Sequence, residues 1–574
     1  MTVKCKSSAC FLIVVGALFF GREATAADVV IRSFASGNGQ NAVGIVEASE
    51  DTEIDGPQGL TTDENGDVYL LDQINQRIVE FDPKAPAADA RILQFPAQLQ
   101  PTDLLVRRSE ILVWDGSVHT LEPRTSGNST SFRGLEEVNT RAADDETVVT
   151  AFAQMGSMPP GDPADLLDQN TRAATSQKPR PRPAQHVATR GAGSVVINII
   201  PQGESQAGIE VRRQTDPIGA PLGRLKLKLR DQLGAVEFLE IDHRGRMFVF
   251  AEDIPVSGGL AAAFVARYSA AGELEGVYEL PLGNAPLSRR FVSVSADGDV
   301  YFLRSQSGSV QVLAVGFRRL SGDKPIDVAI PKYEMPTAMF THGPIAAVRP
   351  LTRQRVIETA FAFEGVQWLV TPSAYGRDPD TVCTGFAGRV RRPFYLHGKL
   401  GQHVRGIPYC WGCHGSLDQI GAKIQRGVLA GNICTHNAPR GDATGVDCSA
   451  FVSAAWGLAT HFTTAAIPAI TNPVKNPWDL RPGDALDKPG SHVMLFLRFT
   501  PNRMAEVMES SPGACNGRVC RNVYPLSSLL ARGYRPVRFR ALESDMTPAA
   551  AILPEEMPTP TKRHGRTLKR HSRR

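Results

Sequence analysis

Apolar and polar positions alternate in short runs, separated by turn signals, through much of the first 330 residues. The clearest copy places the apolar run 68–71 after the Asn65-Gly66 turn, with a second run at 77–81. Together with the segment 56–61 ahead of the turn, this pattern predicts three strands joined by two turns. Further copies with the same shape span residues 104–115, 236–250 and 292–303. Short strands that recur between turns are typical of propeller blades.

We therefore predict a multidomain chain whose first part, residues 28–330, is an all-β, propeller-like domain of five or six blades. The segment 56–82, with Gly56-Pro57-Gln58-Gly59 ahead of its first strand, resembles an NHL-type repeat. An unrelated β-sandwich is the alternative.

Two polar stretches do not continue the strand pattern. Residues 124–190 end in the run Lys178-Pro179-Arg180-Pro181-Arg182-Pro183, and we interpret them as a disordered excursion from the propeller. Residues 546–574 are predicted to be a disordered tail with seven basic residues among the last thirteen. Such runs are usually solvated, although attraction to anionic envelope polymers is the sharper hypothesis.

The pattern changes to a mixture of helices and strands over 340–545. Apolar residues at helical spacing in 353–361 and from Ser449 onward predict two helices, and the apolar run 493–497 predicts a buried strand. A second strand is expected at 504–510. This second domain is predicted to be α+β.

The strongest chemical signal is Cys448 at the start of a predicted helix, with His492 at the start of a predicted strand. Backbone N–H groups and the helix dipole at a helix N-terminus favour the thiolate, which is the reactive form of cysteine. A cysteine and a histidine on adjacent elements are the minimum for covalent acyl transfer. An inert buried thiol is the alternative for Cys448.

Several segments in the same order resemble the NlpC-type family of papain-like cell-wall cysteine peptidases. They are 406–412 ahead of the nucleophile, 445–452 around Cys448, 480–484 before His492, 507–510 on the next strand and 533–536 near the end. The chain departs from the family pattern at Ala450 and Cys413, where glycine is usual, and in a longer insert at 414–444. These departures bear on specificity rather than on catalysis.

The resemblance implies a catalytic set of Cys448, His492 and a third polar residue that orients the imidazole. Glu509 occupies the best-matching position, whereas alternation along the strand puts Glu506 on the opposite face. Oxyanion and substrate contacts are expected from the helix start, at Asp447 and Ser449, and from Tyr409. This chemistry requires no cofactor and no metal.

Composition and cysteine usage indicate an exported protein. Lys4 and Lys6, the apolar stretch 9–20 and Ala24-Thr25-Ala26 predict a signal peptide over 1–26. An uncleaved N-terminal anchor is the alternative. No later segment is apolar enough to span a bilayer, and a net charge of +4 gives no reason to expect nucleic acid as a partner.

Six cysteines besides Cys448 and the two in the leader are disulfide candidates: Cys383, Cys410, Cys413, Cys434, Cys515 and Cys520. Only the pair Cys515–Cys520, which would close a short loop, is predicted specifically. The alternative is a zinc site built from Cys410, Cys413 and Cys434 with His414 or His436.

These observations lead to one expectation and two alternatives. We expect a periplasmic or extracellular cysteine peptidase that hydrolyses an amide of peptidoglycan stem peptides, the bond from γ-D-glutamyl to a diamino acid, through a thioester. One alternative is an envelope-binding propeller whose papain-like domain is a scaffold. The other is a Cys–His amidase acting on an amide outside peptidoglycan.

Overall fold

The structure is a computed structural model. It describes residues 27–47, 52–95, 99–107, 110–115, 118–121, 123–126, 129–132, 184–255, 261–282, 288, 290–306, 308–320, 324–328, 351–376, 391–434 and 441–542. The predicted signal peptide, the predicted boundary near residue 340, Cys383, His436 and the predicted tail lie outside these ranges.

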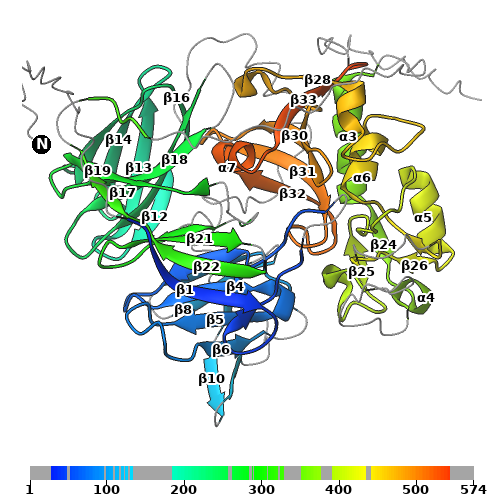
Figure 1. The fold of residues 1–574 in the computed structure, drawn as a ribbon, viewed down its shortest axis with the longest axis horizontal. Coiled ribbons are helices and arrows are strands. Elements are labelled where there is room, and N and C mark those ends of the chain that lie inside the picture. Colours follow the sequence, from blue (N-terminus) through cyan, green and yellow to red (C-terminus); the bar gives the residue numbers. More distant parts are fainter. Residues whose placement is uncertain are drawn as a thin grey trace, which may run out of the picture.

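The N-terminal part consists of five mainly antiparallel sheets, drawn in blue to green in Figure 1. The first has the order β2-β1-β22-β21-β20, with the bounds Ala42–Val43, Val29–Ser36, Ser309–Ala314, Val300–Gln306 and Val292–Val294. Strand β1 therefore pairs with β22, which lies almost 300 residues later in the chain. This pairing places the first strand of the region in one sheet with strands from near its end.

The other four sheets are built mainly from strands that are neighbours along the chain. One has the order β10-β11-β6-β5-β4-β3, with the bounds Pro123–Ser126, Ser129–Phe132, Arg91–Gln94, Arg77–Phe81, Val68–Asp72 and Gly59–Thr62. The next contains β7 (Asp103–Arg107), β8 (Glu110–Trp114) and β9 (Val118–Leu121). A four-stranded sheet contains β12 (Gln185–Thr189), β13 (Gly193–Pro201), β14 (Gln206–Arg213) and β15 (Gly223–Lys228). The fifth has the order β16-β17-β18-β19-β23, with the bounds Gln232–Ile241, Met247–Ile254, Ala262–Tyr268, Leu274–Glu279 and Phe317–Arg319.

These sheets confirm the predicted repeated β-structure and its turns. Asp63, Gly66, Asp242 and Gly245 form two turns that join paired strands, as the sequence pattern predicts. The predicted excursion 124–190 is wrong at both ends, because β10, β11 and β12 lie within it. The Pro-Arg run beside residue 185 concealed the alternation that forms β12. Residues 133–183 lie outside the described part.

The C-terminal part is an α+β arrangement around one antiparallel sheet (Figure 1). The sheet has the order β28-β33-β29-β30-β31-β32, with the bounds Thr471–Pro473, Arg535–Phe539, Ala485–Lys488, His492–Phe499, Ala505–Ser511 and Arg518–Tyr524. The smaller pairs are β24 (Gln367–Leu369) with β25 (His403–Arg405) and β26 (Leu429–Ala430) with β27 (Ala443–Thr444). The helices are α3 (Arg353–Gly365), α4 (Pro372–Tyr375), α5 (Leu417–Gln425), α6 (Cys448–Ala455) and α7 (Leu526–Ala531).

Helix α6 packs against β30, β31 and α3. The side chains of Val356, Phe451, Val493 and Met508 belong to one fully buried cluster between these elements. The amphipathic helix predicted at 353–361 and the strand predicted at 493–497 are confirmed by α3 and β30. Within the described residues, no helix is long and apolar enough to cross a membrane.

The two predicted domains share apolar cores. Met504 and Val523 of the C-terminal sheet lie in the same buried cluster as Phe302 and Val312 of the first sheet. Helix α7 contacts β16, β17 and β18, and it lies between the two halves in Figure 1. At this contact the backbone N–H of Ser527 donates to the buried carboxylate of Glu252 over 2.7 Å. Because apolar side chains of both halves are buried in one core, the two halves depend on each other for stability.

We expect Met504→Ala to destabilise both halves together. Truncation of a buried methionine costs about 3 kcal/mol, and the cavity would open in a core that includes β21 and β22. Amide hydrogen exchange should therefore accelerate in β21 and β22 as well as in β30 and β31. The control is Leu400→Ala, because Leu400 is 50% exposed and its truncation should leave exchange unchanged. Wild-type protection in β21 and β22 of Met504→Ala would contradict the shared core.

Candidate active site

Cys448 is the first residue of α6, and its thiol is reduced and fully buried. The helix begins here because Asp447 caps it: its Oδ1 accepts a hydrogen bond from the backbone N–H of Ala450 over 2.7 Å. Gly445 precedes the cap with φ 154°, and a Cβ there would lie 2.2 Å from the carbonyl oxygen of Pro408. Only glycine fits this approach to the nucleophile.

The side chains of Asp447 and Ser449 are occupied within the helix N-terminus. Asp447 Oδ2 accepts from the backbone N–H of Gly412 over 3.1 Å, and the Ser449 hydroxyl donates to Asp447 Oδ1 over 3.0 Å. The Ser449 hydroxyl also lies 2.7 Å from His461 Nε2. These contacts position the start of the helix. The contribution of Asp447 and Ser449 to substrate binding stays a prediction.

His492 opens β30, and its imidazole is held by Glu509 from the neighbouring strand β31. The Nε2 atom of His492 lies 2.7 Å from Glu509 Oε2. The exposed fraction is 3% for His492 and 0% for Glu509. This bond fixes the ring plane and the tautomer, with the proton on Nε2. The predicted partnership of His492 with Glu509 is therefore present in the geometry.

Two further side chains, which the sequence analysis missed, hold the other oxygen of Glu509. Tyr524 Oη donates to Glu509 Oε1 over 2.7 Å, and Asn522 Nδ2 donates to the same oxygen over 2.8 Å. Both come from β32, where Glu509 pairs with Cys520. Alternation puts Cys520, Asn522 and Tyr524 on one face of β32. This two-residue spacing from Cys520 is the sequence feature that could have identified Asn522 and Tyr524.

Three donors keep the Glu509 carboxylate ionised in a buried place. Burial by itself raises the pKa of this carboxyl, but the hydrogen bond and charge of His492 and the bonds from Asn522 and Tyr524 outweigh burial, so the pKa is lowered. A carboxylate held this way can orient the imidazole and stabilise an imidazolium.

Glu506 lies on the opposite face of β31, as alternation predicts. Its carboxylate contacts Arg498 Nε over 2.6 Å and Arg521 Nη1 over 3.7 Å. It has no contact with His492 among the interactions of the described residues. Glu506 is therefore a matched control for Glu509, because it has the same chemistry on the same strand.

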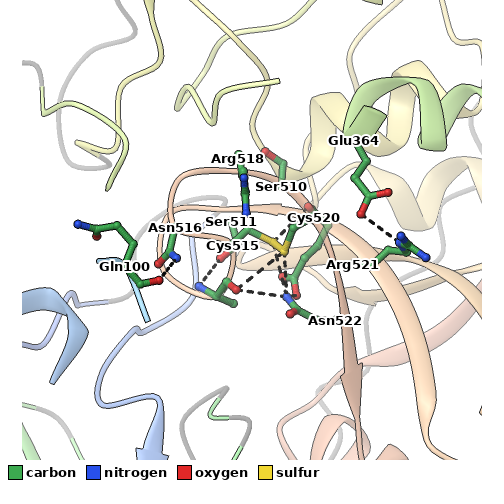
Figure 2. Close-up of a disulfide and its surroundings, with 12 residues drawn as sticks. Gln100, Glu364, Ser510, Ser511, Cys515, Asn516, Arg518, Cys520, Arg521 and Asn522 are labelled. Atoms are coloured by element: carbon green, nitrogen blue, oxygen red, sulfur yellow. Dashed lines mark hydrogen bonds and ion pairs between the residues drawn. A yellow bond between two sulfur atoms is a disulfide. The ribbon is translucent and has the colours of Figure 1, made fainter. Parts of the chain in front are cut away.

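The predicted disulfide Cys515–Cys520 is confirmed, and it lies beside the Glu509 network (Figure 2). Asn522 Nδ2 is 3.5 Å from Cys515 Sγ and 3.4 Å from Cys520 Sγ. The disulfide therefore contacts the side-chain amide of Asn522, which donates to Glu509. Beyond it, Asn516 Nδ2 donates to the carbonyl oxygen of Gln100 in the N-terminal half over 2.7 Å.

Cys410 and Cys413 form a second disulfide, and Cys434 is also disulfide-bonded. These bonds use the three sulfur atoms that the zinc alternative requires. In the part of the chain that is described, no group of three or more histidine, cysteine or acidic side chains could hold a metal ion. His436, one of the two histidines proposed for the zinc site, lies outside the described residues.

The N-terminal half reaches the site through the segment 52–55. The hydroxyl of Thr52 lies 3.3 Å from the hydroxyl of Tyr409, the residue predicted to contact substrate. Glu53 Oε1 lies 2.6 Å from Lys488 Nζ and 2.8 Å from Arg532 Nη2. Sequence analysis did not anticipate this contact, because it joins residues more than 350 positions apart.

A small cavity of about 20 Å³ remains between this segment and the imidazole. It is lined by Glu53, Ile54, Asp55, His492 and residues 511–514 of the β31–β32 turn. A cavity of this size has room for about one water molecule. The segment 52–55 therefore covers the site.

Comparison with known proteins gives little further guidance. No model of a known protein family matches the chain, and no curated protein matches it. Distant structural similarity to β-propeller proteins covers about half of the chain. A streptogramin B lyase structure matches with 10% identity and a TM-score of 0.19 over 51% of this chain and 99% of that chain. A hydrazine synthase of Kuenenia stuttgartiensis matches with 9% identity and a TM-score of 0.18 over 47% of this chain and 80% of that chain. These TM-scores are too low to support any conclusion about function.

Asp55 should make stability depend on pH. Burial raises the pKa of its carboxyl to about 6, although bonds from Gln58 and the backbone of Gly56 lower it. The unfolded chain ionises near pH 4, so the stabilisation is complete below that pH and is lost as pH rises through about 6. Between pH 4 and 7 the wild type should lose about 3 kcal/mol relative to Asp55→Asn.

The measurement is the free energy of unfolding of both proteins by urea at several pH values. The side-chain amide introduced by Asp55→Asn can still accept the bonds from Gln58 and Gly56, so the variant isolates the ionisation. If the free energy of unfolding of the two proteins depends on pH in the same way, Asp55 has the same pKa in the folded and the unfolded chain, and the prediction is wrong.

Proposed function

We propose that the chain is a cysteine hydrolase that cleaves an amide bond through a thioester on Cys448. The observation that carries the proposal is the buried 2.7 Å bond between His492 Nε2 and Glu509 Oε2, on strands that pack directly against the helix whose first residue is Cys448. An oriented imidazole next to a capped cysteine helix is the arrangement that nucleophilic catalysis requires.

In this proposal the Nδ1 atom of His492 accepts the thiol proton, because Nε2 is engaged by Glu509. The Cys448 sulfur attacks the amide carbonyl, and the imidazolium gives its proton to the departing amine. The resulting thioester is hydrolysed by a water molecule that His492 deprotonates. The backbone N–H of Cys448 and the hydroxyl of Tyr409 are the expected oxyanion donors.

The substrate we propose is a peptidoglycan stem peptide, cleaved between γ-D-glutamyl and a diamino acid. The support is the resemblance of five ordered segments to the NlpC-type family, together with the expected signal peptide. Peptidoglycan lies outside the cytoplasm, where disulfide bonds such as Cys410–Cys413 and Cys515–Cys520 are also stable. A periplasmic or extracellular location follows as part of the same proposal.

A second function is favoured by one observation, which is the burial of the proposed catalytic pair. Cys448 has no exposed surface and His492 has 3%, as would suit an envelope-binding protein whose C-terminal domain is a scaffold. Turnover by the intact chain separates the two functions.

The test of the nucleophile is incubation of the full chain with isolated sacculi, followed by mass spectrometry of the released muropeptides. We expect new termini at one stem-peptide bond and none with Cys448→Ala. Wild-type and Cys448→Ala proteins that both leave the sacculi intact would favour the scaffold function. Equal product from the two proteins would exclude Cys448 as the nucleophile.

The test of the third residue compares Glu509→Gln with Glu506→Gln. Loss of the carboxylate beside His492 should lower kcat by at least about 100-fold. The pH dependence of kcat should shift as well, because the imidazolium loses its counter-charge. Glu506→Gln should retain wild-type kinetics, since Glu506 contacts arginines on the other face. Equal losses in the two variants would indicate a structural role for both.

A further inference from the structure

Three side chains of the C-terminal half converge on the carboxylate of Glu53. Lys488 Nζ and Arg532 Nη2 contact Oε1 over 2.6 and 2.8 Å, and the hydroxyl of Tyr534 donates to Oε2. Lys488 comes from the end of β29, Arg532 from the residue after α7, and Tyr534 from the residue before β33. Two cations and a phenol from separate elements form a site that suits a carboxylate.

This group lies directly beside the proposed base. Lys488 is the cross-strand partner of His492 in the β29–β30 pair. The ring of Tyr534 lies perpendicular to the imidazole, with 6.4 Å between the ring centroids. A ligand carboxylate bound here would therefore lie next to the proposed base.

The site also has an unused donor. The side chain of Arg532 is 4% exposed, yet its Nη1 atom has no hydrogen-bond partner among the described residues. An orphaned buried guanidinium nitrogen is costly. Glu53 therefore uses only one of the two terminal nitrogens of the Arg532 guanidinium. A carboxylate that approached Arg532 from another direction could accept hydrogen bonds from both Nη1 and Nη2.

Glu53 itself comes from the other half of the molecule, on a segment that contacts several residues around the proposed base. In the segment 52–55, Thr52 contacts Tyr409, residues 53–55 line the small cavity beside His492, and Asp55 lies against Gly513. A Cβ on Gly513 would lie 1.5 Å from Asp55 Oδ2, so the β31–β32 turn fits closely around this segment.

From these contacts we infer that Lys488, Arg532 and Tyr534 form a carboxylate-binding subsite for substrate, and that Glu53 is its internal occupant in the closed protein. The inference rests on the proposed amide hydrolysis and narrows its substrate class to amides that carry a free carboxylate near the cleaved bond. Substrate binds by displacing Glu53, so the propeller segment competes with it for the same donors.

The experiment uses the full chain and two synthetic peptides. One is L-Ala-γ-D-Glu-L-Lys with the free α-carboxylate on the glutamyl residue, and the other has a carboxamide at that position. Dissociation constants are measured by calorimetry in a Cys448→Ala background, so that turnover does not disturb binding. Glu53→Gln removes the internal charge while keeping its shape, and Glu47→Gln, an exposed residue of the same region, is the matched control.

We expect Glu53→Gln to bind the carboxylate peptide about tenfold more tightly than the background protein does. Binding of the carboxamide peptide should not change, and Glu47→Gln should match the background for both peptides. Adding Lys488→Met to Glu53→Gln should abolish the gain, whereas adding Lys475→Met, on an exposed lysine, should preserve it. If Glu53→Gln does not fold, Glu53→Asp retains the charge on a shorter side chain and should give a smaller gain with the same selectivity.

The outcomes distinguish this inference from the proposed function. An equal gain for both peptides, or no gain for either, would overturn the subsite and leave Glu53 as a structural ion pair. Turnover of both peptides at equal rates by the protein with Cys448 intact would support hydrolysis and overturn the subsite. Selective binding of the carboxylate peptide without any turnover would support the subsite and overturn the hydrolysis.

Discussion

The buried bond between His492 and Glu509 is the interaction on which the candidate site depends. A carboxylate with no exposed surface is stable only when its charge is compensated, and Glu509 achieves this with donors from His492, Asn522 and Tyr524. These donors come from two strands, so the sheet must form in register before the charge can be buried. The disulfide Cys515–Cys520 closes the turn that sets the register at Asn522.

The same sheet connects the site with the N-terminal half. Met504 and Val523 pack into a core shared with the first sheet, and Ser527 donates to Glu252. This docking carries the segment 52–55 onto the site, where Glu53 meets Lys488 and Arg532. Two cations lower the pKa of Glu53 to about 2 against the effect of its burial, which raises it. The carboxylate therefore stays charged in this place at any physiological pH.

Much of the local structure could be predicted from the sequence. The helix after Asp447, the strand after His492 and the opposite faces of Glu506 and Glu509 follow from capping chemistry and from the periods of helices and strands. The loop closed by Cys515 and Cys520 is short enough to predict from spacing. The alternation in β12 was concealed by the adjacent Pro-Arg run, which is why the predicted excursion was too long.

The sequence by itself therefore pointed to Cys448 and His492, because each stands at the start of a local helix or strand pattern, whereas Glu509 was expected only from the resemblance to the NlpC-type family. Only the tertiary structure decided that Asn522 and Tyr524 complete the Glu509 network, because this requires the register between β31 and β32. It alone also placed Glu53 on Lys488 and Arg532. That contact joins positions more than 400 residues apart, and no local periodicity reports on the packing of one domain against another.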